Sequence, residues 1–410
     1  MKVLSTVKKT KTTSFLLILH TIFVAIFCDI KSLNYALTYG GFIGEGAMAV
    51  LYSIIVACIF TVSILRSKFR FNSFRPYGIF LILYLVVFFL FTVFFIGPPH
   101  VSLSLFCVFV VCAFLIPNVT DVKARLMIKL IMCMPFFAVF RLNQIFGITE
   151  IWLNEISMDA SYSFLLPIIA NIVYIRFYFK DEKKFAKIVT IFFSAINCVF
   201  LGYVLIFGSR APILCILSLL VFWYLSRMKQ DGIGVRFNKN KVFELVLIVI
   251  VLIVMGQVVI TGLVSFLESY GISISALNKI ISLGDDGDVS NGRNELYTLA
   301  VNGFYESPLF GHGLDRFDAR YPGTDYPHNF ILQALYDGGL LLTLLLLLPL
   351  SLRIKRYFKK CSYDDYVVFS LLFFASVPGA LFSQDLWSNA VLWLCFGLLF
   401  SKHFVYEKCA

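Results

Sequence analysis

The feature that most constrains this chain is a succession of apolar runs, each about as long as a membrane-crossing helix. Such a helix needs about 20 predominantly apolar residues, because the hydrocarbon core of a bilayer is about 30 Å thick. Runs of this kind recur along most of the sequence. About twelve spans are predicted, at residues 14–30, 43–65, 76–96, 101–117, 126–146, 160–178, 186–206, 210–226, 242–265, 329–351, 364–382 and 386–403.

Composition supports a polytopic membrane protein, since 60% of the residues are hydrophobic and only 14% are charged. Soluble domains are far less apolar. The ten cysteines are scattered without metal-ligand spacing, and none lies in the one long connection, so a disulfide-stapled ectodomain is excluded. Without internal repeats or low-complexity linkers, residues 1–410 are predicted to form a single, all-α integral membrane domain.

The net charge of +11 raises the possibility of a nucleic-acid partner, but the distribution of the charges argues against one. Basic residues gather in every second connection. By the positive-inside rule, both termini and all basic connections are predicted to be cytoplasmic. No small-residue cleavage site follows the first span, so we expect it to be retained as a helix. The basic clusters lie at 66–75, 123–125, 176–187, 227–241, 353–360 and 402–408.

The long connection at 266–328 is predicted to lie outside the cytoplasm, between the ninth and tenth spans. Its first part, 267–281, is a candidate interfacial amphipathic helix. The acidic cluster Gly284–Asp288 is interpreted as a solvated turn in preference to a metal site, because the distal glutamate of a calcium loop is missing. A capping signal at Ser290 then predicts a helix that ends near Tyr305.

Two arginines stand at predicted helix N-termini on the outer face. Arg210 follows Ser209, a candidate cap, and precedes Pro212, while Arg293 lies in the first turn of the loop helix. A cation there opposes the helix dipole. A bound phosphate reverses that balance, because free amide groups and a guanidinium then face one anion. For Arg210, contact with a lipid phosphate at the interface is an equally good interpretation.

His328 lies at the N-terminal end of the tenth span, where the helix dipole disfavours its protonated form and leaves it able to accept a proton. Asn329 is expected either to cap that helix or to bond substrate. Asp337 places a carboxylate in the outer part of the span, which is costly in lipid, so it is expected to face a cavity or the histidine. His312 lies between glycines and is interpreted as a turn residue.

Together these residues suit one reaction. The arginines would hold a diphosphate, and the histidine would take a proton from an incoming hydroxyl while the diphosphate leaves. In a membrane, that leaving group is expected to be a polyprenyl diphosphate.

The order of four motifs adds a family resemblance that covers residues 205–345. These are Ser-Arg-Ala at 209–211, Gly-Arg-x-x-x-Tyr at 292–297, Ser-Pro-Leu-Phe-Gly-x-Gly at 307–313 and Pro-His-Asn-Phe-Ile-Leu-Gln-x-Leu-x-x-x-Gly at 327–339. The combination resembles the O-antigen polymerase (Wzy) and O-antigen ligase superfamily of bacterial membrane glycosyltransferases.

The resemblance implies a GT-C-like fold in the bacterial inner membrane, a periplasmic active site, and an undecaprenyl-diphosphate-linked glycan as donor and acceptor. It implies that Arg210 and Arg293 engage the diphosphate and that His328 activates the acceptor hydroxyl, without a metal or another cofactor. Tyr297, Asn329 and Asp337 are then expected to contact substrate. A chain-length regulator and a flippase are the partners expected from the family, beside the membrane lipids.

Three functions remain open at this point. The Pro-His-Asn-Phe-Ile-Leu run and the short cytoplasmic connections favour a polymerase, which joins lipid-linked repeat units, over a ligase, which transfers the glycan to lipid A core. A flippase for the same lipid-linked sugars is the alternative outside the enzymes. Transporters usually show paired halves or charged, broken helices near the midplane, whereas here the polar groups gather at one outer edge.

Overall fold

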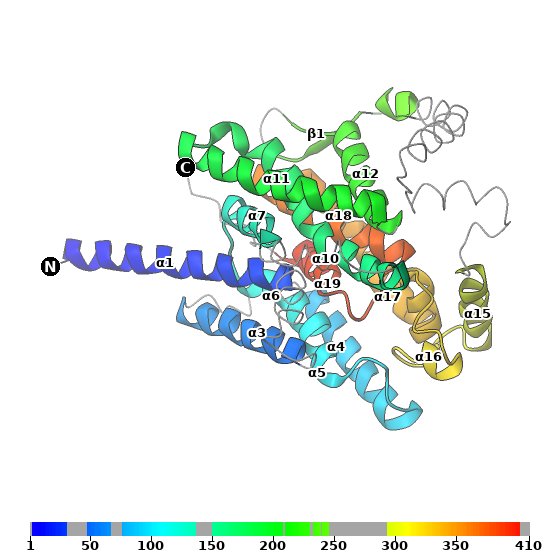
Figure 1. The fold of residues 1–410 in the computed structure, drawn as a ribbon. Helices are drawn as coiled ribbons and strands as arrows, with labels where there is room; N and C mark the ends of the chain where they lie inside the picture. The colour runs from blue at the N-terminus through cyan, green and yellow to red at the C-terminus, as the bar shows by residue number, and fades with distance from the viewer. Residues whose placement is uncertain are drawn as a thin grey trace, which may run out of the picture.

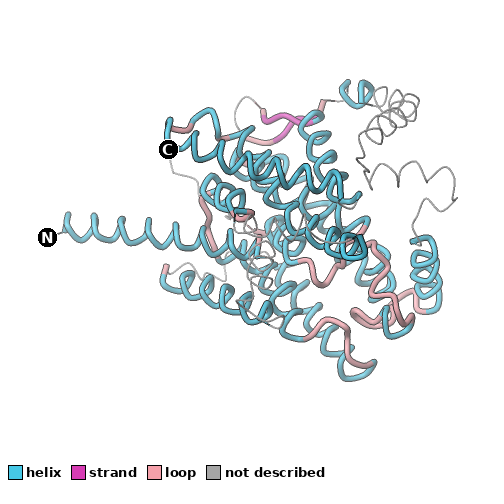
Figure 2. The backbone as a smooth tube through the Cα atoms, in the orientation of Figure 1, coloured by secondary structure: helices cyan, strands magenta, loops and turns pink. Residues whose placement is uncertain are grey.

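The computed structural model describes residues 2–30, 47–66, 76–136, 150–207, 210–229, 233–238, 240–245 and 293–401. Helices dominate these ranges, and the strands found in them form one short hairpin (Figure 2). In this hairpin, β1 (Ser226–Met228) pairs antiparallel with β2 (Val235–Phe237). The described residues are therefore essentially all-α, as predicted.

The helices pack together as a bundle. The N-terminus lies on one side of it and helices α15 and α16 lie on the other (Figure 1). Their bounds are α1 (Lys2–Cys28), α3 (Ala47–Leu65), α4 (Pro76–Phe91), η2 (Thr92–Ile96), α5 (Leu103–Phe106), η3 (Cys107–Cys112), α6 (Ala113–Val119), α7 (Ala124–Cys133), α10 (Glu150–Phe177), η4 (Phe179–Asp181), α11 (Lys184–Phe207), α12 (Arg210–Leu225), α15 (Arg293–Glu306), α16 (Phe317–Arg320), α17 (Phe330–Lys360), α18 (Tyr363–Phe382) and α19 (Ala390–Phe400).

Four helical segments of the described chain are long and apolar enough to cross a bilayer, at Pro76–Ile96, Lys184–Leu205, Phe330–Lys360 and Tyr363–Phe382. Each lies on a predicted span. Shorter apolar helices lie on further predicted spans, at Ser14–Cys28, Ala49–Leu65, Leu103–Val119, Ser161–Phe177, Ala211–Leu225 and Ala390–Phe400. The membrane-helix architecture agrees with the sequence, while the total of twelve spans stays a prediction.

Several predicted elements lie outside the described residues. They include most of the ninth span, the amphipathic helix at 267–281 and the acidic cluster Gly284–Asp288. The described end of the long connection contains α15 and α16. The first of these begins at Arg293 and ends at Glu306, close to the predicted end of the loop helix.

The core of the bundle forms where helices distant in sequence pack together. Helix α12 packs along α18, α10 lies among α7, α11 and α18, and α19 packs on α6. The α19–α6 contact depends on Gly397, because a Cβ at that position would collide with the backbone carbonyl of Phe114. At the start of α19, the buried rings of Trp387 and Trp393 stack with centroids 5.9 Å apart.

Helix α17 is interrupted at Gly339, whose φ of 61° and ψ of −158° are not helical. The backbone amides that follow the break bond to the preceding connection. The amide of Leu340 donates to the carbonyl of Pro308 at 2.8 Å, and that of Leu341 donates to the carbonyl of Leu309 at 3.2 Å. A break in an apolar helix is tolerated only where such groups find partners, and here the loop 308–313 provides them.

The same loop also satisfies the carbonyls before the break. The amide of His312 donates to the carbonyl of Tyr336 at 3.0 Å, and that of Gly313 donates to the carbonyl of Asp337 at 2.9 Å. Gly311 has a φ of 68°, and a Cβ there would collide with the carbonyl of Asp337. Gly311 in the loop and Gly339 in the helix are therefore both required, because the two backbones are in direct contact there.

The chain after this loop docks on the start of η2, which directly follows α4, and on the α4–α5 connection. The amide of Leu314 donates to Thr92 Oγ1 at 2.9 Å. Asp315 accepts from the amide of Val101 at 2.6 Å through Oδ2, and its carbonyl accepts from the amide of His100 at 3.1 Å. Residues 308–316 thus join α17 to the α4–α5 connection and hold the end of the bundle where the candidate site lies.

We predict that Gly339→Ala lowers stability by more than about 3 kcal/mol, because it adds backbone strain and a collision. An alanine Cβ would lie 2.5 Å from the carbonyl carbon of Leu309. Gly323→Ala is the control, since Gly323 also has a positive φ (89°) but nothing within 4 Å of the Cβ position. Thermal unfolding of the purified proteins compares the two, and equal losses would contradict the proposed loop–helix contact.

A second prediction concerns Asp315, whose pKa is raised by burial and by the neighbouring charge of Asp385. The folded state therefore retains a proton that the unfolded chain releases, so stability falls as the pH rises from the ordinary carboxyl value through the raised pKa. Asp315→Asn keeps an acceptor oxygen and tolerates the φ of 55°.

Melting temperatures from about pH 5 to about pH 9 should therefore fall more steeply for the wild type than for Asp315→Asn. Parallel curves for the two proteins would show that this carboxyl titrates alike in the folded and unfolded states.

Candidate functional site

His328 is held in the turn that precedes α17, with a φ of 53° that is uncommon for a residue with a side chain. Its Nδ1 lies 3.4 Å from the carbonyl oxygen of Ser383. A carbonyl only accepts, so this contact places the proton on Nδ1 and leaves Nε2 as the nitrogen with a lone pair. Tyr326 packs beside the ring, with centroids 4.4 Å apart, and the histidine is half-buried.

The environment of His328 favours its neutral form. Burial lowers the pKa of the imidazole, the hydrogen bond to Ser383 opposes this shift, and the positive charge of Arg293 lowers the pKa further. The resulting pKa of His328 lies below the ordinary histidine value. A neutral imidazole with an available Nε2 is the form that accepts a proton.

Arg293 reaches the same place from a different element. It is the first residue of α15, and its Nη2 donates to Ser383 Oγ at 3.5 Å. The predicted partners Arg293 and His328, far apart in sequence, therefore meet at one residue. Tyr297 lies one turn further along α15, where it is half-buried.

Helix α12, which begins at Arg210, runs antiparallel to α18. Near the far end of the pair, Trp223 Nε1 donates to Ser370 Oγ at 3.4 Å. Nearer the candidate site, Cys215 Sγ lies 3.6 Å from the Cβ position of Gly379. Residues nearer the start of α12 therefore lie beside residues nearer the end of α18.

This register indicates the level at which α12 begins. Arg210 precedes Cys215 by about the same number of residues as Ser383 follows Gly379, and both helices rise about 1.5 Å per residue. The backbone of Arg210 is thereby brought to the end of the bundle that carries Ser383. The side chain of Arg210 lies outside the described part of the chain.

Asn329 caps α17, which was one of its two predicted roles. Its side-chain oxygen accepts from the amides of Ile331 and Leu332 at 2.9 and 3.1 Å. Its side-chain nitrogen donates to the carbonyl of Leu381 at 3.1 Å. Both ends of the amide are thus engaged within the protein, and a contact with substrate stays a prediction.

Asp337 is fully buried inside the protein. Its Oδ2 accepts from Trp387 Nε1 at 2.6 Å, while Oδ1 has no partner among the described residues. The carboxylate that the sequence placed in a span is therefore enclosed by protein, with Trp387 as its partner in place of the expected cavity or histidine. Its predicted contact with substrate remains a prediction.

Ser383 is the residue at this site that the sequence did not single out. It ends α18, its hydroxyl accepts from Arg293, and its carbonyl faces His328 and accepts from the hydroxyl of Tyr326 at 2.8 Å. The available signal was the polar stretch Ser383-Gln384-Asp385, which forms the whole connection between two predicted spans. Such a run at the predicted outer face belongs to the same edge as the arginines and the histidine.

Gln333 fixes the chain just after Ser383. This buried side chain donates from Nε2 to Asp385 Oδ1 at 2.5 Å and accepts from the amide of Leu386 at 2.8 Å. Asn329 bonds to the carbonyl of Leu381. The start of α17 therefore bonds to the backbone both before and after Ser383. The residues that meet at Ser383 are therefore held by a rigid helix end.

His312 has a structural role, in line with its interpretation as a turn residue. Its Nε2 lies 2.8 Å from the carbonyl of Gly303, and its Nδ1 lies 3.4 Å from Arg320 Nη1. The carbonyl can only accept and the guanidinium can only donate, so these contacts fix one neutral tautomer with both nitrogens engaged. Its ring also packs on Tyr336, with centroids 4.8 Å apart.

The site therefore presents a guanidinium beside a neutral imidazole, at a point where several helices end. This arrangement is able to bind an anion and to accept a proton from a hydroxyl. Among the described residues, no group of three or more His, Cys, Asp or Glu side chains has a geometry that suits a metal ion.

Part of the chain is similar to a known protein family. Residues 195–347 match a family model described as O-Antigen ligase, and this range contains α12, α15, α16 and the first half of α17. Among curated proteins, none matches the chain. The matched range includes Arg210, Arg293 and His328, the residues that the motifs had indicated. Over residues 195–347, the chain is therefore similar to the O-antigen ligase family.

Proposed function

We propose that the protein is an O-antigen polymerase, which joins undecaprenyl-diphosphate-linked oligosaccharide repeat units at the periplasmic face of the bacterial inner membrane. The observation that carries the proposal is the meeting of Arg293 and His328, both inside the matched range 195–347, at Ser383, which lies beyond it. A cation and a neutral base side by side suit a reaction with an anionic leaving group and a hydroxyl nucleophile.

In the proposed reaction, Arg293 and Arg210 bind the diphosphate of the donor. His328 Nε2 takes the proton of the acceptor hydroxyl, whose oxygen attacks the anomeric carbon of the donor sugar. The new glycosidic bond forms as the carbon–oxygen bond to the diphosphate breaks, and undecaprenyl diphosphate leaves with the bonding electrons. The two guanidinium groups supply the positive charge that stabilises this leaving group, so the proposed step is metal-independent.

The description of the family model as an O-antigen ligase supports one alternative. A ligase would use the same donor and the same chemistry at the diphosphate, with lipid A core as the acceptor. Deletion of the gene separates the two functions. Lipopolysaccharide that retains core plus one repeat unit indicates a lost polymerase, and bare core indicates a lost ligase.

We predict that His328→Ala, Arg293→Ala and Arg210→Ala each reduce polymer formation at least about a hundredfold, because each removes a group from the reaction. Lysine at either arginine position should also be poor, since a point charge does not reproduce a bidentate fork on phosphate. Polymer length on gels, at matched protein levels, measures the effect.

The matched control for these variants is His100→Ala, which removes an exposed histidine from the connection beside Asp315. It should retain wild-type polymer. Wild-type polymer from a His328→Ala strain with normal protein levels would eliminate the proposed base.

The pH dependence of the reaction provides a further prediction. Burial and the charge of Arg293 lower the pKa of His328, so the neutral, proton-accepting form persists below the ordinary histidine value of about 6.5. Polymerisation by purified protein should therefore decline on the acid side only below about pH 6.5. An acid limb above that value would contradict the assignment of a neutral His328 as the base.

A further inference from the structure

The exposed face of α17 changes character along its length. Exposed leucines recur every four residues, so they follow one ridge that winds gradually around the helix axis. Two cationic residues then continue the same spacing. The stripe consists of Leu340, Leu344, Leu348, Leu352, Arg356 and Lys360.

A cavity of about 460 Å³ opens beside the cationic end of this stripe. Four of the side chains that line it are basic and come from the last turns of α17. These are Arg353, Arg356, Lys359 and Lys360. Ser401 and Asp365 contribute further polar groups to the wall.

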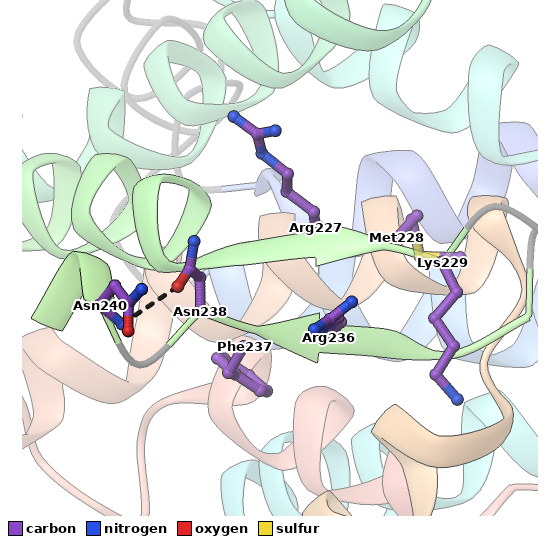
Figure 3. Close-up of a pocket in the computed structure, with 7 residues that line it drawn as sticks. All are labelled: Arg227, Met228, Lys229, Arg236, Phe237, Asn238 and Asn240. Carbon is purple, nitrogen blue, oxygen red and sulfur yellow. Dashed lines mark hydrogen bonds between the residues drawn. The ribbon is translucent and has the colours of Figure 1, made fainter.

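A second cavity, of about 960 Å³, lies along the β1–β2 hairpin and is lined by Arg227, Lys229 and Arg236 (Figure 3). In this view Arg227 and Lys229 extend to opposite sides of the hairpin. The hairpin is fixed to the end of α17, because the amide of Gly234 donates to the carbonyl of Cys361 at 2.9 Å. The two cavities therefore belong to one cationic end of the bundle.

Acidic side chains are scarce among the described residues that line the two cavities. Asp365 is the one carboxylate in the wall of either cavity, and its Oδ2 already accepts from the hydroxyl of Ser362 at 2.8 Å. No carboxylate in the described chain forms a salt bridge with Arg356, Lys359 or Lys360. The dipole at a helix C-terminus offsets only about half a charge, so the cavity favours an anion.

We propose that this face binds an anionic phospholipid, with an acyl chain along the leucine stripe and its phosphate in the cavity beside Arg356 and Lys360. The stripe from Leu340 to Leu352 rises by about 18 Å, close to the half-thickness of about 15 Å of a bilayer core. The cations therefore follow the leucines at the level where lipid phosphates lie. An amphiphile fits this face better than a free phosphate, because the apolar and cationic parts are continuous.

The lipid site is separate from the candidate active site. Helix α18 begins beside the cationic cavity at Tyr363 and ends next to Ser383, and its twenty residues span about 30 Å. The inference therefore does not depend on the proposed glycosyl transfer. Its failure would leave that function untouched.

The test uses the full-length protein in detergent, with phosphatidylglycerol, phosphatidylcholine or inorganic phosphate added at equal phosphate concentration. Phosphatidylglycerol should raise the melting temperature of the wild type, and the other two additions should not. Arg356→Gln/Lys360→Gln should weaken the apparent affinity for phosphatidylglycerol at least about tenfold, as the loss of two cations near a lipid phosphate implies. Native mass spectrometry of retained lipid provides a second readout.

The matched control is Lys183→Gln/Lys184→Gln, which removes two exposed charges outside both cavities. It should bind phosphatidylglycerol as the wild type does. An equal loss in both double variants would show non-specific attraction and overturn the site. Equal stabilisation by inorganic phosphate would overturn the lipid as occupant in favour of a soluble anion.

Discussion

The interaction on which the functional end of the molecule depends is the contact between the loop 308–313 and the break in α17. A membrane helix cannot leave backbone groups without partners, and here the groups freed at Gly339 are bonded by the loop on both sides of the break. The contact leaves no room for side chains at Gly311 or Gly339. The residues that follow the loop, Leu314 and Asp315, bond to Thr92 and Val101, so the segment between α15 and the His328 turn is also held against the α4–α5 connection.

The contact between the loop and α17 supports the geometry of the candidate site. The first turn of α17 holds the chain around Ser383 through Asn329 and Gln333. Ser383 in turn meets Arg293 and His328, so residues from α15, the α17 turn and the end of α18 share one small region. The cationic cavities occupy the opposite end of α18. The charges that would bind a substrate diphosphate and those that would bind a membrane lipid are thus separated by the length of a helix.

Local patterns predicted the helices and several of their ends, because apolar spacing and capping residues act within one segment. The start of α15 at Arg293 and the cap at Asn329 are examples. The role of Ser383 was not predicted, since nothing beside it in sequence indicates that two distant residues meet there. Likewise, Asp337 was seen as a costly charge, but its partner Trp387 lies fifty residues away and became apparent only from the packing.

The most direct test of the central claim is a stoichiometric assay with purified protein in liposomes that contain undecaprenyl-diphosphate-linked repeat units. Glycan length and released undecaprenyl diphosphate are measured in the same samples over time. If the arginines and His328 carry out transfer from a lipid diphosphate, one undecaprenyl diphosphate should appear for each glycosidic bond formed. Movement of the lipid-linked repeats across the bilayer without bond formation, or bond formation without release of the diphosphate, would contradict the account.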